Sequence, residues 1–213
     1  MSNFKPSDIL VYVARHGTTV LNQSGCFRGP LDPDLDKQGW ADANTLKYYF
    51  EPIELGGIFY SPKKRSRHTA MLIHRDKGDI PFVGHPNLQA LDVGHLGGQK
   101  KTPDTEAEVQ YHTDHPDEPF QDGESFNDFK GRVRPLLVDA VKMALRFGKP
   151  MLIVAHSSIV HETGELFNGD HSSTLVEPGG VAAVYCQDGQ LNAEAIFKPD
   201  EERIGHSRAA VIT

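Results

Sequence analysis

The chain of 213 residues is poor in cysteine and has no long apolar run. Its two cysteines, Cys26 and Cys186, lie far apart and lack the spacing of a zinc site or a redox pair, so we expect reduced thiols and no metal. No apolar stretch approaches the length that spans a membrane, and residues 1–8 lack the apolar core of a signal peptide. These absences predict a cytoplasmic protein without a membrane partner.

Positive charge is also scarce in this chain. The 29 acidic residues outnumber the 22 lysines and arginines, which gives a formal net charge of -7. Such a balance repels the backbone of nucleic acids, so we expect no nucleic-acid partner. Because 38% of the residues are apolar and no low-complexity linker or repeat interrupts the chain, residues 1–213 are expected to form one domain.

Short apolar runs alternate along the chain with segments of helical periodicity. This alternation predicts an α/β fold of three layers, with a mostly parallel sheet between helices and one antiparallel hairpin around Asp188-Gly189. Pro135 lies inside one predicted helix and should kink it near Arg134. We expect strands over 9–14, 58–61, 80–85, 151–155, 181–186 and 191–197, and helices over 36–50, 65–74, 125–148 and 159–167.

The first apolar run ends in Arg15-His16-Gly17, a set of residues suited to phosphate chemistry. A neutral histidine is a nucleophile near physiological pH. An arginine offers a fork of donors that matches two phosphate oxygens, and a glycine lets an anion approach the backbone. By themselves these three residues also fit a strand-to-loop turn with a structural histidine.

Two further predicted strands end in residues of the same kind. Arg65 opens the helix that follows the second strand, and His156 follows the strand over 151–155. Ligands of open α/β sheets bind at the carboxyl ends of the strands, so Arg15, His16, Arg65 and His156 are expected to converge on one anion. Arg28 would add to this local cationic pocket on an acidic protein. His156 could alternatively cap the next helix.

In these motifs the chain resembles the histidine phosphatase superfamily, which includes the cofactor-dependent phosphoglycerate mutases. Arg15 to Thr19 with Asn22 resembles the motif R-H-G-E/Q-T-x-x-N, with Thr18 as a departure, and Ser61 to Ala70 resembles S-P-x-x-R-A-x-Q-T-A. Further matches are Gly123-Glu124-Ser125, Val154-Ala155-His156, and the spacing of Gly29, Asp32, Leu35, Gly39 and Ala43. The resemblance implies the three-layer fold of the phosphoglycerate mutases.

One family motif fails where a proton would be transferred. Family members often carry L-x-E-x-x-x-G-x-x-x-G, whose Glu protonates the leaving oxygen, and the register of Leu88, Gly94 and Gly98 puts Ala90 in its place. Asp92 lies two residues on, and in an extended segment its side chain shares a face with position 90. We therefore interpret Asp92 as the general acid, with a role in capping or turning the loop as the alternative.

Together these residues predict a phosphatase that hydrolyses a small phosphomonoester through a phosphohistidine. His16 would attack phosphorus, while Arg15, Arg65, Asn22, His156 and Arg28 bind the substrate. Because arginines and imidazole neutralise the phosphate, this chemistry needs neither a metal nor another cofactor. A mutase, which returns the phosphoryl group to a second hydroxyl, and a catalytically impaired member that only binds phosphorylated ligands are the alternatives.

The stretch 97–123 is polar, acidic and rich in proline, with a possible helix opening at Thr102-Pro103. It could form a lid over the site and set substrate specificity. A solvated surface excursion is the alternative interpretation.

Overall fold

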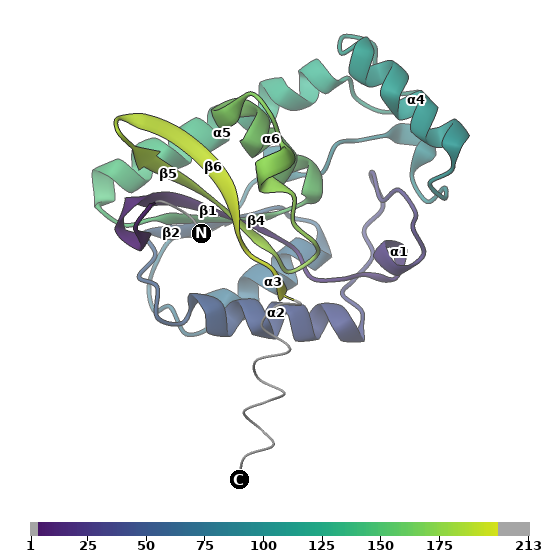
Figure 1. Ribbon diagram of the computed structural model, residues 1–213. Helices are drawn as coiled ribbons and strands as arrows, with labels where there is room; N and C mark the ends of the chain where they lie inside the picture. Colours follow the sequence, from purple (N-terminus) through teal and green to yellow (C-terminus); the bar gives the residue numbers. More distant parts are fainter. Residues whose placement is uncertain (1–3, 200–213) are drawn as a thin grey trace.

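A computed structural model of the protein describes residues 4–199 and has one mixed sheet between helices (Figure 1). The strand order is β3-β2-β4-β1-β5-β6. The first four of these are parallel to one another, whereas β5 pairs antiparallel with both β1 and β6. The strands are β1 (Ile9–Arg15), β2 (Gly57–Tyr60), β3 (Phe82–Gly84), β4 (Met151–Ala155), β5 (Val181–Gln187) and β6 (Gln190–Phe197). The predicted α/β class and the antiparallel hairpin are confirmed.

Helices cover both faces of the sheet, as Figure 1 shows. The helices are α1 (Val20–Gln23), α2 (Lys37–Phe50), α3 (Lys64–His74), α4 (Pro103–Asp114), α5 (Phe126–Phe147) and α6 (Ser157–Asn168). Single 3-10 turns lie at Pro6–Asp8, Pro86–Leu88, Gly94–Leu96 and Ser172–Thr174. The helices α2 and α3 pack on one face, and α5 and α6 pack on the other.

Strand β1 shows why the sheet is covered on both sides. Val11 and Val13 point into the core formed with α5 and α6, whereas Tyr12 and Ala14 point into the core formed with α2 and α3. All four are buried, which is the pattern of a central strand in a three-layer protein. This central position brings the end of β1 to the middle of the sheet edge.

The ends of the long helices follow from local hydrogen bonds. The Asp36 carboxylate accepts a hydrogen bond from the backbone N–H of Gly39 and starts α2. Ser125 and Asp128 form a capping box that starts α5, and Gly148, in the left-handed region with φ 63°, ends it. The helix α5 continues through Pro135 as one element.

Two elements differ from the sequence-based expectation. Strand β3 has only three residues, because the chain turns at Gly78 to Ile80 and Pro81 has no N–H to donate to a neighbouring strand. The four-residue helix α1 was not predicted, since so short a segment shows no periodicity. The predicted helix in the stretch 97–123 is present as α4, which lies with α1 on the side of the molecule toward which β1 runs (Figure 1).

Candidate active site

The ends of three neighbouring parallel strands bring the predicted residues together. Strand β4 lies between β2 and β1, and its register pairs Ala155 with Arg15 and Val154 with Tyr60. The residues that come next, His16, Ser61 and His156, therefore emerge at the same edge of the sheet. The ring centroids of His16 and His156 are 5.2 Å apart.

Hydrogen bonds fix the tautomer of His16. Its Nδ1 lies 2.7 Å from the carbonyl oxygen of Gly17. A carbonyl can only accept, so the proton resides on Nδ1 and Nε2 keeps its lone pair. Nε2 in turn accepts a hydrogen bond from Nε of Arg65 at 3.2 Å. The nitrogen of His16 that can act as a nucleophile therefore faces a guanidinium group.

The charge state of His16 follows from its surroundings. Its side chain has no exposed surface, and burial lowers its pKa well below 6.5. Electrostatic interactions with Arg65, with a protonated His156, with Arg28 and with Arg15 lower the pKa further, in that order. The imidazole is therefore neutral at neutral pH, and the three predicted arginines all act on it electrostatically.

His156 is oriented by a serine. It is the residue preceding α6, yet its side chain makes no capping bond and instead places Nε2 2.8 Å from Oγ of Ser61. Because the Ser61 oxygen already accepts the N–H of Lys63, its own hydrogen is free to bond Nε2. The proton of His156 then resides on Nδ1, a buried atom with no hydrogen-bond partner in the described part of the chain. Burial first, then Arg65 and Arg28, holds the pKa of His156 well below 6.5.

Buried arginine atoms also lack partners. Nη2 of Arg65 and Nε of Arg15 make no hydrogen bond within residues 4–199. One donor of each arginine is anchored by a carbonyl, since Arg65 Nη1 lies 3.0 Å from Leu31 O and Arg15 Nη1 lies 2.8 Å from Val176 O. Burial lowers the pKa of both groups to about 10, so they remain charged at neutral pH. Unsatisfied buried N–H groups are costly, and an oxyanion would satisfy these.

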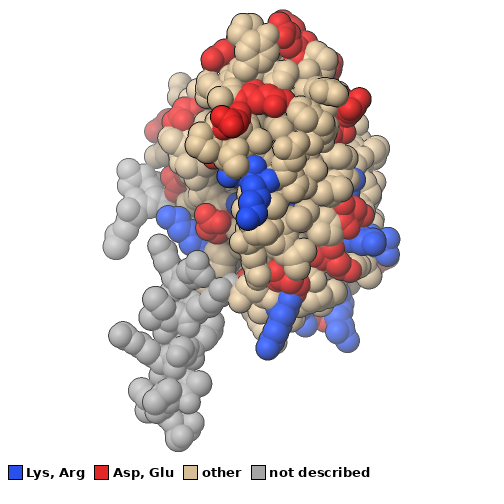
Figure 2. Space-filling view, turned by 90° about the vertical axis from the view of Figure 1, so that its right-hand side faces the viewer, with Lys and Arg blue, Asp and Glu red and all other residues tan. Residues whose placement is uncertain are grey.

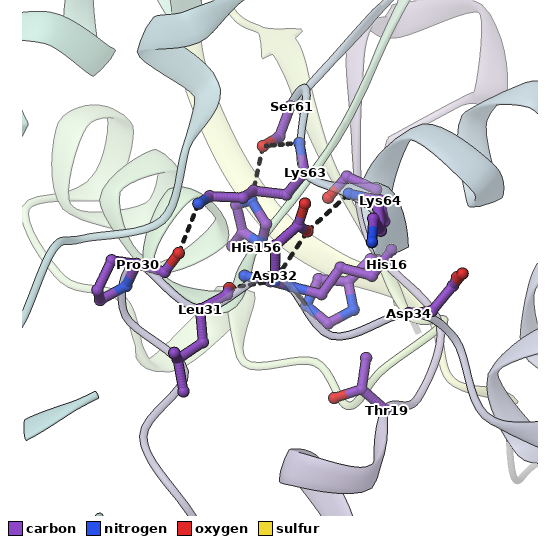
Figure 3. Close-up of polar contacts among 12 residues, drawn as sticks. His16, Thr19, Pro30, Leu31, Asp32, Asp34, Ser61, Lys63, Lys64 and His156 are labelled. Atoms are coloured by element: carbon purple, nitrogen blue, oxygen red, sulfur yellow. Dashed lines mark hydrogen bonds and ion pairs between the residues drawn. The ribbon is translucent and has the colours of Figure 1, made fainter. Parts of the chain in front are cut away.

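The loop 30–34 is tied to the start of α3 beside the histidines, as Figure 3 shows. Nζ of Lys63 donates to Pro30 O at 2.6 Å, and the backbone N–H of Lys64 donates to Oδ1 of Asp32 at 2.8 Å. Ser61 and Lys63 were not singled out as site residues by sequence reasoning. Only the motif S-P-x-x-R carried a signal for Ser61.

A cavity of about 520 Å³ begins at Arg28 and His156 and extends between α4, α5 and α6. Arg28 is positioned by its Nη2, 3.4 Å from Oγ of Ser157. A second cavity of about 350 Å³ adjoins the first, because Gly29 and Ala90 line both. Within residues 4–199 no group of three His, Cys, Asp or Glu side chains is placed to hold a metal ion, and no helix is long and apolar enough to cross a membrane.

Comparisons with known proteins identify the family of the chain. The family model of the histidine phosphatase superfamily (branch 1) matches residues 11–178. The chain belongs to this family. It is 29% identical over 192 residues to a 2,3-bisphosphoglycerate-dependent phosphoglycerate mutase of Methylobacterium sp. (strain 4-46), covering 83% of this chain and 90% of the relative.

The chain is also similar to proteins that are named as phosphatases. A Hydrogenobacter thermophilus protein with the name "Putative phosphoserine phosphatase 2" is 29% identical over 163 residues, with 75% of this chain and 78% of the relative covered. Among solved structures, phosphoglycerate mutase from Bacillus anthracis superposes with a TM-score of 0.73 at 21% identity over 90% of this chain and 95% of that one. A mycobacterial glucosyl-3-phosphoglycerate phosphatase gives a TM-score of 0.74 at 17% identity over 88% and 98%.

Close backbone packing explains why residues 17 and 39 are glycines. A Cβ on Gly17 would lie 2.3 Å from Gly39 O, and a Cβ on Gly39 would lie 1.9 Å from Thr18 O. The loop after β1 can therefore approach the start of α2 only through these glycines. Thr18, the departure from the family motif, donates its hydroxyl to the buried Asp42 carboxylate at 2.6 Å.

At the position of the family's acid, Ala90 lines both cavities, while Asp92 lines only the second. Oδ1 of Asp92 accepts the backbone N–H of Gly94 at 2.9 Å, so this carboxylate does turn its loop. The Asp92 backbone N–H donates to Glu124 at 2.9 Å, and Glu124 pairs with Arg132 at 2.5 Å. Arg132 was missed by sequence reasoning, because nothing in a helical pattern marks one arginine as holding a distant loop.

Asn22 is placed within the first family motif. Its Oδ1 accepts hydrogen bonds from the backbone N–H and the hydroxyl of Thr19, at 3.1 and 2.8 Å, and so starts α1. The predicted role of Asn22 in substrate binding stays a prediction.

Figure 2 shows basic side chains gathered at the centre of one face, with acidic side chains above them.

Proposed function

We propose that the protein is a metal-independent phosphatase that hydrolyses a small phosphomonoester through a phosphohistidine on His16. The observation that carries the proposal is the fixed tautomer of His16, whose Nε2 lone pair faces the Arg65 guanidinium. A histidine that served only the fold would have no need of unpartnered arginine donors close by.

Substrate binding uses the donors that lack partners. The phosphate dianion accepts from Arg65 Nη2, Arg15 Nε and His156 Nδ1. Arg28, which lines the main cavity together with His156, and Asn22 complete the substrate-binding set. Binding draws the Arg65 guanidinium from Nε2 of His16 to the phosphate oxygens. The same move exposes the nucleophile and neutralises the anion.

Two displacements then follow. Nε2 of His16 forms a bond to phosphorus as the bond to the ester oxygen breaks, and Asp92 gives that oxygen its proton. Water next attacks phosphorus as the bond between phosphorus and Nε2 of His16 breaks, Asp92 takes the proton of the water, and inorganic phosphate leaves. The guanidinium groups and His156 balance charge throughout, so no step requires a metal.

The support for Asp92 is its place beside position 90. It lines the cavity that adjoins the main one, and the Glu124–Arg132 pair holds its backbone. Its Oδ1 accepts the backbone N–H of Gly94, whereas its Oδ2 accepts no hydrogen bond within residues 4–199. The role requires this oxygen to reach the leaving group from the adjoining cavity.

The cellular setting is proposed from composition. Cys26 and Cys186 are both free thiols, which suits the reducing cytoplasm. The net charge of -7 disfavours nucleic acid as a partner, and the proposed phosphatase function makes the partner a small phosphorylated metabolite.

A mutase is the second candidate, favoured by the phosphoglycerate mutase relatives. The two reactions are separated by incubating the protein with 3-phosphoglycerate and a panel of sugar and nucleotide phosphates, with His16→Ala as control. We expect release of inorganic phosphate that the variant lacks. Isomerisation of phosphoglycerate without phosphate release would establish the mutase, and binding without turnover would establish an impaired member.

A further inference from the structure

The main cavity has two unlike walls. Ser157, His161 and Glu165, spaced four residues apart on successive turns of α6, line one side. The other side is mostly apolar and is built from the segment after α1, from the segment that follows Leu88, from α4 and from the start of α5. Its members are Phe27, Leu91, Val93, Val109, Phe126 and Phe129. The cavity is therefore amphipathic along its length.

The length of the cavity exceeds what a three-carbon phosphate needs. Arg28 and His156, which belong to the proposed phosphate site, are among the residues that line it. From Ser157 to Glu165 the helix rises about 12 Å, at about 1.5 Å per residue. The volume of about 520 Å³ lies in the range of sites for drug-sized ligands.

The carboxylates along α6 are already paired. Glu162 binds Nε of Arg134 at 2.5 Å, and Glu165 binds Nδ1 of His171 at 2.7 Å. The ring of His161 stacks on that of His171, with centroids 5.2 Å apart. Burial lowers the pKa of His161 to about 4, so it is neutral and offers one N–H and one lone pair. Glu162 is thus paired with an arginine, and His161 and the hydrogen-bonded Glu165 give this wall its hydrogen-bonding groups.

Two lysines also line the cavity. The ammonium of Lys101 lies 5.5 Å from the ring centroid of Phe27, and Lys101 is exposed. Lys130 is half-buried. Long lysine stems cover apolar surface while their charges stay in water, so these residues extend the apolar wall. The opposite possibility, that they bind a second anionic group, is separated by the experiment below.

We propose that the substrate carries its phosphate on an elongated body, with an apolar side against Val109 and Phe126 and a hydrogen-bonding edge against His161. This inference rests on the proposed phosphatase function, which supplies the anchor for the phosphate. The segment 97–123 then acts as a specificity wall, since α4 contributes Val109, Gln110 and Thr113 to it.

A homologous series of n-alkyl phosphates, from ethyl to octyl, tests the inference. All members share an alkoxide leaving group, so differences in kcat/KM reflect only how the alkyl chain binds. We expect a rise of about two- to fourfold for each added methylene, since a fully buried methylene is worth about fourfold. The rise should level off once the chain spans about 12 Å. A flat or falling series overturns the inference.

Variants locate the effect within the cavity. Val109→Asp should flatten the series, because a charge in the wall opposes the burial of methylenes. Val138→Asp, on an exposed part of α5, is the matched control and should leave the slope unchanged. Should Val109→Asp fail to fold, Phe126→Ala replaces it, with a reduced slope as the expected result. An unchanged slope in a folded cavity variant overturns the inference.

The remaining outcomes are also distinct. Hexyl phosphate is compared with the same chain ending in a carboxylate, and the carboxylate should lower kcat/KM. A higher kcat/KM for the carboxylate would mean that Lys101 and Lys130 bind an anion, and would overturn the apolar assignment. If the proposed phosphatase function is wrong, no member of the series is hydrolysed, ethyl phosphate included. If only the inference about the cavity is wrong, the series is hydrolysed without a rise in kcat/KM.

Discussion

Nε of Arg65 lies 3.2 Å from Nε2 of His16, so one guanidinium group both covers the nucleophile and offers an unpartnered Nη2 to a phosphate. Both side chains are fully buried. The contact stabilises the neutral imidazole and keeps its lone pair directed at the anion site.

Replacing Arg65 should therefore change both rate and pH dependence. Arg65→Met should lower kcat/KM by about two to three orders of magnitude, the loss typical of removing a donor to a developing charge. Because Arg65 is the largest electrostatic cause of the lowered pKa of His16, the acid limb of kcat/KM should move to higher pH. Rate profiles over pH 4–8, corrected for substrate ionisation, measure both effects.

Arg67→Met serves as the control for this experiment, because Arg67 lies exposed on the same helix. It should leave the profile unchanged. An Arg65→Met protein that folds and keeps the original acid limb would contradict the assigned contact.

Asp92 is tested through the leaving group. Asp92→Asn should slow the hydrolysis of alkyl phosphates by about a hundredfold to ten-thousandfold and that of activated aryl phosphates little, since a poor leaving group needs the proton most. The asparagine oxygen can still accept the N–H of Gly94, so the turn is preserved. Asp104→Asn, at the exposed start of α4, is the control. Equal small effects on both substrate classes would remove Asp92 from the role.

His161 should make the fold sensitive to acid. The folded protein leaves this imidazole unprotonated down to about pH 4, whereas in the unfolded chain it binds a proton near pH 6.5. The unfolded state thus binds more protons between these values, so stability is complete above about pH 6.5 and is lost as the pH falls. His161 alone should lower the free energy of unfolding by about 2 kcal/mol between pH 7 and pH 5.

Urea unfolding at the two pH values measures this loss. The lowered pKa values of His16 and His156 act in the same direction, so some acid sensitivity remains in any single variant. His161→Gln should reduce the loss by about 2 kcal/mol, while the exposed control His115→Gln should not change it. If His161→Gln loses as much stability between pH 7 and pH 5 as the wild-type protein does, the fold does not keep this imidazole neutral.

Much of the fold could be read from the sequence because it depends on regular patterns. The apolar run of β1, the cap at Asp36 and the turn at Asp188-Gly189 each follow a local rule of backbone geometry. The meeting of His16, Arg65 and His156 followed from one further rule, that parallel strands present their carboxyl ends at one edge.

Contacts between irregular segments could not be read in this way. The bond from Lys63 to Pro30 and the support of the 87–92 loop by Arg132 join residues far apart in sequence without any periodicity. Thr18 illustrates the same limit, because its binding to Asp42 depends on the close approach of Gly17 and Gly39. Packing of this kind also decides the shape of the main cavity.

The central claim, that His16 carries the phosphoryl group, is tested most directly by trapping the intermediate. The protein is mixed with a phosphomonoester, quenched within the first turnovers and digested, and the acid-labile phosphoryl group is mapped by mass spectrometry. The account predicts the group on His16 in the wild-type protein and its absence in His16→Ala. Turnover with no adduct on His16, or an adduct on another residue that persists in His16→Ala, would contradict it.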